Sequence, residues 1–582
     1  MLLRPPLLVR LVAAALGGLL VAVAFPEPGW WWLAAPGVGL LVAAVAGARV
    51  RTGALAGLVH GLVLFVVLLR WTAEYVGPVA YALSVLEAGF TALAGALLVL
   101  VLRVGRRGAG HVRREGWAPT GPAAVLLTAL GAGGVWTGVE ALRGRLPFGG
   151  FGWGRLAFSQ ADAPAVGLAS LGGAPLVSFA VATTGAALAL VLLRGALAAG
   201  AAAPARRTGT TSPAGATSRA RAAGAAVAPL ALALVAGGAG ALVPRPTDPE
   251  AGTLVVAAVQ GDVPEPGLEF NAERRAVLDN HVRATERLAD AVAAGEVPQP
   301  DLVVWPENAS DIDPFANADA AAQIDRAADA VGAPLLVGTL VRGSRGTGVA
   351  ATGDPLEDDE LRNVVVQWDP GSGPGHVYAK RHPVPFAEYV PHRDFFRLFS
   401  DKVDLVRADM VPGEVPGLFD VAGTTAGTLI CFEVVEDGLV DDVVDGGAQL
   451  LVVPTNNATF GFTDESVQQL AISRVRAVEE GRAVVHASTV GVSAVVQPDG
   501  STGRTTDLFT PDVLVSEVPL RTTRTLSARL GAWPELALSL LGAAVALAGA
   551  LPGRRGRRAG LPSAAPPAAD AEPVGASAGG PR

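Results

Sequence analysis

Long apolar runs fill most of the first 245 residues and are the strongest constraint on how this chain can fold. A helix that crosses a bilayer needs about 17–25 predominantly apolar residues. Seven stretches before residue 245 meet this length, and an eighth follows near the C-terminus. They cover about 7–25, 30–47, 53–69, 79–102, 122–142, 164–193, 224–243 and 533–551. The sequence therefore predicts a polytopic α-helical membrane protein of about eight spans.

Composition supports a membrane protein and excludes several other classes. Hydrophobic residues make up 51% of the chain, charged residues 17%, and the mean hydropathy is +0.42. The net charge of −8 provides no basic footprint, so we expect no nucleic-acid partner. A single cysteine excludes an intramolecular disulfide and any multi-cysteine metal site. The histidines lack ligand spacing, and we expect neither a metal nor another cofactor.

Arginines between the expected spans alternate in a way that predicts topology, because cytoplasmic loops of membrane proteins are enriched in Lys and Arg. The arginine-rich segments lie before the first span, in every second loop and after the last span. Their arginines are Arg4, Arg10, Arg49, Arg51, Arg103, Arg106, Arg107, Arg113, Arg114, Arg194, Arg206, Arg207, Arg219, Arg221, Arg554, Arg555, Arg557 and Arg558. The loop after the fifth span departs from the pattern with Arg143, Arg145 and Arg155. Both termini are thus expected in the cytoplasm, and residues 245–530 on the opposite side.

The apolar pattern also predicts the domain organisation. Residues 1–245 form a seven-span domain with a low-complexity cytoplasmic loop at about 195–223, and residues 246–530 form an outer domain. Residues 531–552 form the final span, and 553–582 a disordered cytoplasmic tail. Aromatic residues lie among glycines at 146–155, just outside a span. This loop fits either an ordinary aromatic belt at the lipid interface or a substrate contact.

Strand and helix patterns alternate through the outer domain, which indicates an α/β class. We expect strands at 253–260, 301–307, 334–340, 363–368, 425–431, 449–454, 482–487, 493–497 and 512–518. Helices are expected at 271–294, 320–331 and 466–480, the last with one apolar face packed on the sheet.

Three side chains in this domain supply the parts needed to form an acyl-thioester. Cys431, the only cysteine, ends an expected strand, Glu307 ends another, and Lys380 lies in a proline-punctuated loop that also holds Glu388. Each residue alone also has a plainer interpretation as a buried thiol, a solvated strand end or a surface charge. Together they offer a nucleophile, a base and a cation that can stabilise an oxyanion.

The order Glu307, Lys380, Cys431 resembles the Glu-Lys-Cys triad of the carbon–nitrogen hydrolase (nitrilase) superfamily over roughly residues 250–520. This resemblance implies an α-β-β-α sandwich, with two sheets between helix layers. Membrane spans on both sides of such a domain are similar to the bacterial apolipoprotein N-acyltransferase family. The motifs that carry this likeness lie at 259–264, 305–307, 380–391, 431–433 and 454–457.

The family resemblance implies a reaction, its partners and its place in the cell. A fatty acyl chain would pass from a membrane phospholipid to Cys431, and then to the N-terminal amine of diacylglyceryl-cysteine in apolipoproteins. We expect a monomer in the bacterial plasma membrane, with its catalytic domain extracytoplasmic. In the first half-reaction Glu307 would act as general base, and Lys380 would stabilise the oxyanion.

Supporting roles are expected for four further residues. Glu388 would position Lys380 or the incoming amine, Phe432 would shape the acyl entrance, and Glu433 would hold its loop. Phe270 stands where many family members have Trp. Two more departures from the family pattern are Phe432, where Tyr is frequent, and Thr459, where Trp is frequent.

Three alternatives remain open from the sequence. A membrane-tethered amidase or nitrilase would share the triad but pass the acyl group of a small amide to water. A transporter with an outer accessory domain would need charged groups along its spans, and only Glu87 and His60 lie at mid-depth, with Glu140 near a span end. A vestigial site is disfavoured because all three triad residue types are present.

Overall fold

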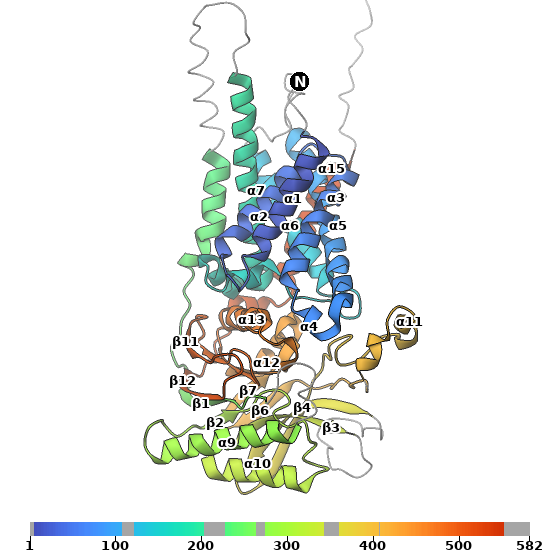
Figure 1. Ribbon diagram of the computed structural model, residues 1–582. Helices are drawn as coiled ribbons and strands as arrows, with labels where there is room; N and C mark the ends of the chain where they lie inside the picture. Colours follow the sequence, from blue (N-terminus) through green and yellow to red (C-terminus); the bar gives the residue numbers. More distant parts are fainter. Residues whose placement is uncertain are drawn as a thin grey trace, which may run out of the picture. The chain divides into compact units, whose positions relative to one another are not determined.

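A computed structural model describes residues 5–107, 122–202, 227–263, 274–342, 360–406 and 408–551. Phe270, the tail at 553–582 and most of the expected low-complexity loop lie outside these residues. Residues up to Ala550 form one compact unit, and all contacts below belong to it. In Figure 1 the apolar helices gather at one end of this unit and the sheets at the other.

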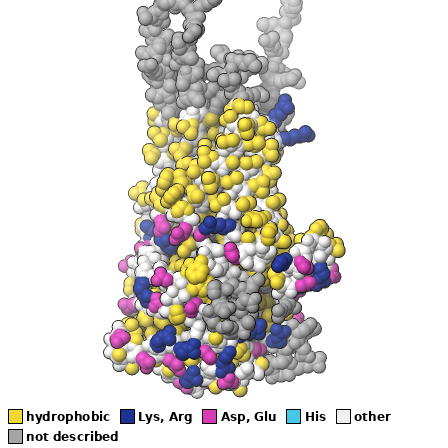
Figure 2. All heavy atoms as spheres, viewed as in Figure 1, with side chains coloured by type: hydrophobic (Ala, Val, Ile, Leu, Met, Phe, Trp, Pro, Cys, Tyr) yellow, Lys and Arg dark blue, Asp and Glu magenta, His cyan; other side chains and the backbone are white. Residues whose placement is uncertain are grey.

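Apolar helices occupy each expected span. They are α1 (Leu7–Ala22), α2 (Ala34–Val45), α3 (Val50–Leu68), α5 (Tyr81–Arg107), α6 (Pro122–Arg143), α7 (Ala169–Ala202), Val227–Leu242 and α15 (Trp533–Ala550). In the described chain, five helical segments have the length and composition to cross a bilayer, while Leu7–Ala22, Trp31–Val45 and Val227–Leu242 are shorter. Hydrophobic side chains cover the visible face of this helical part, whereas charged side chains gather over the sheets (Figure 2). The chain therefore carries the apolar surface that a bilayer requires.

The last helix, α15, packs against α5 and α6 although it follows the outer domain in sequence. Glycine permits this close crossing. A Cβ atom added to Gly542 would lie 2.2 Å from the carbonyl carbon of Gly134, so neither position has room for a side chain. Small residues at such crossings allow helix backbones in membranes to approach each other.

The three arginines that depart from the loop pattern are all engaged in ion pairs. Arg143 is buried and lies 2.8 Å from Glu87, one of the mid-depth charges of the spans. The pairs of Arg145 with Glu535 and of Arg155 with Asp437 measure 2.5 and 2.6 Å. These arginines therefore connect parts of the protein instead of standing as free charges in a loop.

The outer domain contains two six-stranded sheets. The first has the order β12-β1-β2-β3-β4-β5 and the second the order β11-β10-β9-β8-β7-β6. In each, three adjacent strands are parallel, β1-β2-β3 and β7-β8-β9, and the outer pairs are antiparallel. The strands are β1 (Thr253–Gln260), β2 (Leu302–Val304), β3 (Leu335–Arg342), β4 (Leu361–Asp369), β5 (Gly373–Ala379), β6 (Gly417–Val421), β7 (Thr424–Thr428), β8 (Leu450–Thr455), β9 (Ala483–Ser488), β10 (Ala494–Val496), β11 (Thr502–Thr505) and β12 (Asp512–Pro519).

Helix layers cover both outer faces, which gives the α-β-β-α arrangement. The two sheets share one apolar core between them, which includes Val256, Val304 and Val452. Helices α9 (Arg274–Ala293) and α10 (Ala318–Val331) pack on the first sheet. Helices α12 (Asp437–Asp445) and α13 (Glu465–Glu480) cover the second sheet, and their core is continuous with that of the membrane helices.

The prediction that α13 buries only one face was incomplete. Nearly every residue of this helix is buried, including Gln468, Arg476 and Glu480. The reason is that α13 lies between the strands β9 and β10 on one side and the membrane helix α7 on the other. A helix that is buried between two layers needs no polar face for water.

Two further differences concern strands. The strand before Cys431 ends at Thr428, three positions earlier than expected, because the chain turns there into a 3-10 helix at Cys431–Val435. Strands β5, β6 and β11 did not emerge from the sequence pattern. All three are edge strands, and the exposed or glycine-containing positions of β5 and β11 break the apolar run that marks buried strands.

Candidate active site

The expected triad comes from three chain segments whose ends meet at one edge of the sandwich. Glu307 follows β2, Lys380 directly follows β5, and Cys431 opens the 3-10 helix after β7. Strand β5 runs parallel to β2. The reason is that β3 is parallel to β2, β4 is antiparallel to β3, and β5 is antiparallel to β4. The sheet topology therefore brings the carboxyl ends of these strands together, and the side chains of Glu307 and Lys380 are both buried.

Lys380 is held between two carboxylates. Its Nζ donates to Glu307 Oε1 at 3.1 Å and to Glu388 Oε1 at 2.9 Å. The amide of Asn363 donates to the same two oxygens, at 2.6 and 3.0 Å. Burial lowers the pKa of Lys380, but the two neighbouring carboxylates outweigh it and hold this pKa well above its ordinary value. Lys380 is thus a fixed cation.

Glu307 is positioned from both of its oxygens. Oε1 accepts from Lys380 and Asn363, and Oε2 accepts from the backbone N–H of Asn456 at 3.0 Å. Glu388 Oε2 accepts a hydrogen bond from the backbone N–H of Val384 at 2.7 Å. Three residues, Asn363, Val384 and Asn456, therefore fix the two carboxylates around one ammonium group.

Cys431 adopts a left-handed backbone conformation, with φ of 55°, at the turn from strand to helix. Such a conformation is uncommon for a residue with a side chain and places the thiol at a sharp turn. Burial and the charge of Glu307 raise the pKa of the Cys431 thiol, while Lys380 lowers it. The resting sulfur is therefore a neutral thiol, which needs a base to become a nucleophile.

Glu433 holds together the two loops that carry Lys380 and Cys431. Its carboxylate is fully buried and accepts from the Tyr378 hydroxyl, from the backbone N–H groups of Arg381 and His382, and from that of Ile430. These contacts span 2.6 to 3.1 Å. A buried carboxylate with this many donors is a structural tie between the loops.

Phe432 connects the site to the helical domain. Its ring stacks on Phe151 at 5.6 Å and on Trp153 at 6.2 Å between centroids, and His382 lies at 6.4 Å. Phe151 and Trp153 belong to the aromatic, glycine-containing loop at 146–155. The loop therefore packs against the residue that follows the nucleophile.

Several site residues were not singled out from the sequence. Asn363 bridges both carboxylates, and Thr455 and Gln469 contact the Cys431 sulfur. Asn363 lies at the start of a run that indicates only a strand, and Thr455 lies in the 454–457 motif, to which no role was assigned. Gln469 lies on a helix that carries polar residues at many other positions, so its sequence pattern did not distinguish it.

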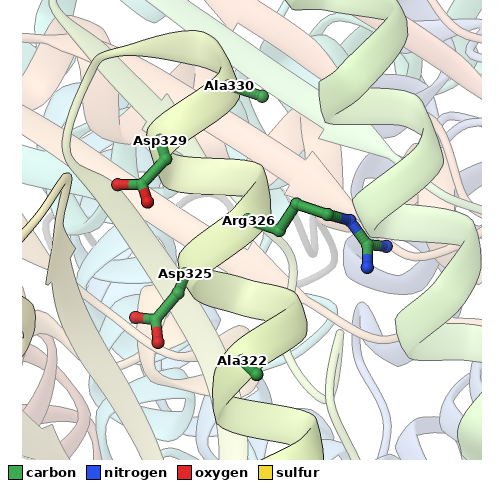
Figure 3. A pocket seen from close by; sticks show the side chains of 5 residues that line it. All are labelled: Ala322, Asp325, Arg326, Asp329 and Ala330. Atoms are coloured by element: carbon green, nitrogen blue, oxygen red, sulfur yellow. The ribbon is translucent and has the colours of Figure 1, made fainter.

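The hollow of Figure 3 lies apart from this site, on the outer helix α10. Ala322, Asp325, Arg326, Asp329 and Ala330 line it. Asp325 accepts from the Trp368 indole and Asp329 from the backbone N–H of Gly371, each at 2.7 Å. Its carboxylates therefore fasten α10 to the β4–β5 hairpin. Within the described ranges, no cluster of three His, Cys, Asp or Glu residues could hold a metal ion.

Two family models match the chain. The N-terminal domain of apolipoprotein N-acyltransferase matches residues 17–187, and the carbon-nitrogen hydrolase model matches 255–528. The apolipoprotein N-acyltransferase of Mycolicibacterium smegmatis is 41% identical over 92% of this chain and 84% of its own. The chain belongs to the apolipoprotein N-acyltransferase family. The family member of Azotobacter vinelandii is 30% identical over 75% of each chain.

Among solved structures, an amidase from Nesterenkonia sp. aligns with 46% of this chain and 90% of its own, at 20% identity and a TM-score of 0.33. Membership of the apolipoprotein N-acyltransferase family makes this chain a membrane-embedded acyltransferase with a carbon-nitrogen hydrolase domain. This family membership therefore favours acyl transfer over the amidase and transporter alternatives.

Proposed function

We propose that this enzyme transfers a fatty acyl chain from a membrane phospholipid, through a thioester on Cys431, to the N-terminal amine of diacylglyceryl-cysteine in apolipoproteins. The observation that carries the proposal is the cluster that the buried Glu307 and Lys380 form with the partly buried Cys431. It joins a base, a fixed cation and a thiol at one sheet edge, next to a loop from the apolar helices. An acyl donor that is dissolved in a bilayer requires such a junction.

In the first half-reaction, Glu307 takes the thiol proton while the sulfur attacks the ester carbonyl of the phospholipid. The Lys380 ammonium stabilises the oxyanion of the tetrahedral intermediate. Collapse of this intermediate breaks the ester C–O bond, and Glu307 returns the proton to the departing lysophospholipid oxygen. The products are lysophospholipid and the Cys431 thioester.

In the second half-reaction, the amine of the lipoprotein attacks the thioester carbonyl. Glu307 accepts the proton that the amine loses, and the C–S bond breaks to release the N-acylated product. The sulfur regains a proton, and the site returns to its resting state. Glu388 keeps Lys380 in place throughout, and Phe432, packed on Phe151 and Trp153, lines the acyl entrance.

The proposal includes eight spans, both termini in the cytoplasm and a monomeric enzyme whose outer domain is extracytoplasmic. The alternating arginines support this topology. Arg143, Arg145 and Arg155 count less against it, because each is paired with a carboxylate of the protein. A plasma-membrane location follows from the need for a phospholipid donor.

Purified enzyme in phospholipid micelles, supplied with a diacylglyceryl-cysteine peptide, tests the transferase proposal. We expect N-acyl peptide and lysophospholipid in equal amounts, with ping-pong kinetics. The matched control is the same peptide with an acetylated amine, which should allow only one acylation of Cys431. Free fatty acid released equally fast with the blocked peptide would show that water is the acceptor and would establish the amidase alternative.

The nucleophile is tested in the same assay. Cys431→Ala should abolish both turnover and the acyl mass added to the protein, because the chain holds no other thiol. Cys431→Ser should acylate and then release its acyl group slowly, since an oxygen ester reacts less readily with an amine. Undiminished transfer by Cys431→Ala would remove the basis of the proposed function.

A further inference from the structure

Two neutral hydrogen-bond donors contact the Cys431 sulfur, and neither belongs to the triad. The Thr455 hydroxyl, at the end of β8, lies 3.2 Å from Sγ. The Gln469 amide nitrogen Nε2, on α13, lies 3.5 Å from the same atom. Both side chains are completely buried, while Cys431 itself is partly buried. A thiolate at a partly buried position needs such donors, because a charge that loses water without gaining hydrogen bonds is costly.

The surrounding network fixes which end of the Gln469 amide faces the sulfur. Asn457 Nδ2 donates to Gln469 Oε1 at 2.9 Å and to Glu465 Oε2 at 2.6 Å. The oxygen of the Asn457 amide, Oδ1, accepts from the Ser488 hydroxyl, so the orientation of Asn457 is also fixed. A reversed Gln469 would place two N–H groups against each other at Asn457. Its Nε2 must therefore point toward Cys431.

The Thr455 hydroxyl has one proton and two acceptors, the sulfur and Gln469 Oε1, which lies 2.8 Å away. A neutral thiol is a weak acceptor, so in the resting site the proton goes to the amide oxygen. When the sulfur becomes anionic, it is the stronger acceptor, because hydrogen bonds to charged groups are the strong ones. A rotation about one bond then redirects the hydroxyl to the sulfur.

Lys380 cannot meet this need alone. Two of its three N–H bonds are directed at Glu307 and Glu388, and the remaining one is required by the oxyanion of the substrate. The negative charge on the sulfur arises at a different atom. It arises twice, first when Glu307 takes the thiol proton as the sulfur begins its attack, and again when the thioester C–S bond breaks and its electron pair returns to sulfur.

We propose that Thr455 and Gln469 are further catalytic residues, which donate to the anionic sulfur of Cys431 in both half-reactions, and that Asn457 and Glu465 are positioning residues for the Gln469 amide. The proposal deepens the proposed function, on which it rests for the role of Cys431 as nucleophile. It requires no additional reactant, since only hydrogen bonds are redirected.

The single cysteine allows a direct test on the full-length enzyme in detergent micelles. Iodoacetamide can modify only Cys431, and intact mass follows the adduct over time at a series of pH values. Thr455→Val and Gln469→Leu should each slow alkylation about tenfold at any pH below the thiol midpoint, equivalent to a rise of about one unit in its apparent pKa. The other titratable groups near the sulfur, Glu307, Lys380 and Glu465, remain in both variants.

Matched substitutions separate this effect from general damage. Thr455→Ser keeps the hydroxyl and should alkylate at the wild-type rate. Thr428→Val removes an equally buried hydroxyl from the neighbouring strand β7, where it has no hydrogen-bond partner among the described residues, and should also match wild type. Asn457→Ala should slow alkylation as much as Gln469→Leu, and the double variant should be no slower than either alone.

Wild-type alkylation rates in both Thr455→Val and Gln469→Leu would overturn the proposal. If wild-type alkylation by iodoacetamide is too slow to follow, the rate of acyl-enzyme formation is measured instead. Intact mass again follows the adduct at a series of pH values. Slower alkylation combined with full N-acylation would overturn the catalytic role and leave the proposed function intact. Loss of the proposed function itself would appear instead as turnover by Cys431→Ala.

Discussion

At the scale of single residues, the site depends on the balance of one cation and two carboxylates. Glu307 and Glu388 both bind Lys380, and Asn363 donates to both. Glu307→Gln keeps the shape of the side chain but removes the base, so acyl-enzyme formation should slow by about 10²–10⁴. Lys380→Met should slow it by about 10²–10³ if the ammonium stabilises the oxyanion. Time-resolved intact mass measures both rates.

Stability must be separated from chemistry in this experiment, because removing one member of a buried ion pair destabilises a protein by about 3–5 kcal/mol. The double variant Lys380→Met with Glu388→Gln removes a charge of each sign and relieves that penalty. It should fold better than Lys380→Met and remain equally slow. Recovery of the wild-type rate would mean that Lys380 serves stability alone. Lys402→Met, at an exposed position, is the control for the substitution itself.

Glu465 gives the site a pH dependence of stability. Burial and the nearby charge of Glu307 raise the pKa of Glu465 to about 8. The hydrogen bond from Asn457 lowers this pKa but does not outweigh them. The folded protein thus keeps a proton that the unfolded chain releases above its ordinary carboxyl pKa of about 4.3. Folding stability should therefore fall as pH rises through this window, by up to about 1.4 kcal/mol per pH unit from this group, and level off above pH 8.

Glu465→Gln keeps an acceptor for Asn457 and removes the titration, so its apparent unfolding temperature should decline less between pH 5 and 8 than that of wild type. Tryptophan fluorescence during heating provides the measurement. Glu296→Gln, at an exposed position after α9, should decline as wild type does. An unchanged slope in Glu465→Gln would show that this carboxyl is already ionised in the folded protein.

At the scale of elements, the sequence predicted whatever is encoded by local periodicity. The continuous apolar run of β1 gave its bounds, and the helical spacing of α13 gave all but its first residue. Strand β5 was not predicted because its first half, residues 373–376, is largely exposed and contains two glycines. The triad could be found from residue types in order. Thr455 and Gln469 could not, since their role depends on a contact between β8 and α13 that no local pattern encodes.

The crossing of α6 and α15 is an element whose packing can be tested. Alanine favours a helix over glycine by about 1 kcal/mol, so Gly542→Ala would stabilise an isolated α15. In the protein its methyl group would lie 2.2 Å from Gly134, which forces the helices apart. We expect a lower apparent unfolding temperature and weaker acyl transfer. Gly89→Ala, in α5 with no atom near its added Cβ, should unfold at or above the wild-type temperature.

At the scale of the whole molecule, the helical domain and the outer domain are joined through α13. Gln468 accepts from the Trp153 indole at 2.9 Å, and Glu479 accepts from the backbone N–H of Ala174 at 2.9 Å. Arg476 donates to the carbonyls of Val434 and Val435, in the turn that Cys431 opens. One buried helix therefore links the spans to the turn of the nucleophile, which keeps the site in a fixed relation to the apolar helices.

The proposed topology predicts where added cysteines can be labelled. In a Cys431→Ala background, Ser212→Cys lies in the loop assigned to the cytoplasm, and Arg287→Cys lies at an exposed position of α9 in the outer domain. An impermeant maleimide added to intact cells whose outer envelope admits it should label Arg287→Cys and spare Ser212→Cys. Both should react after the membrane is opened, which controls for burial of either thiol. Eight spans and two cytoplasmic termini fix the sides of both positions together. Labelling of Ser212→Cys alone in intact cells would therefore reverse the proposed orientation of the protein. Labelling of both cysteines would instead change the number of spans between the two positions.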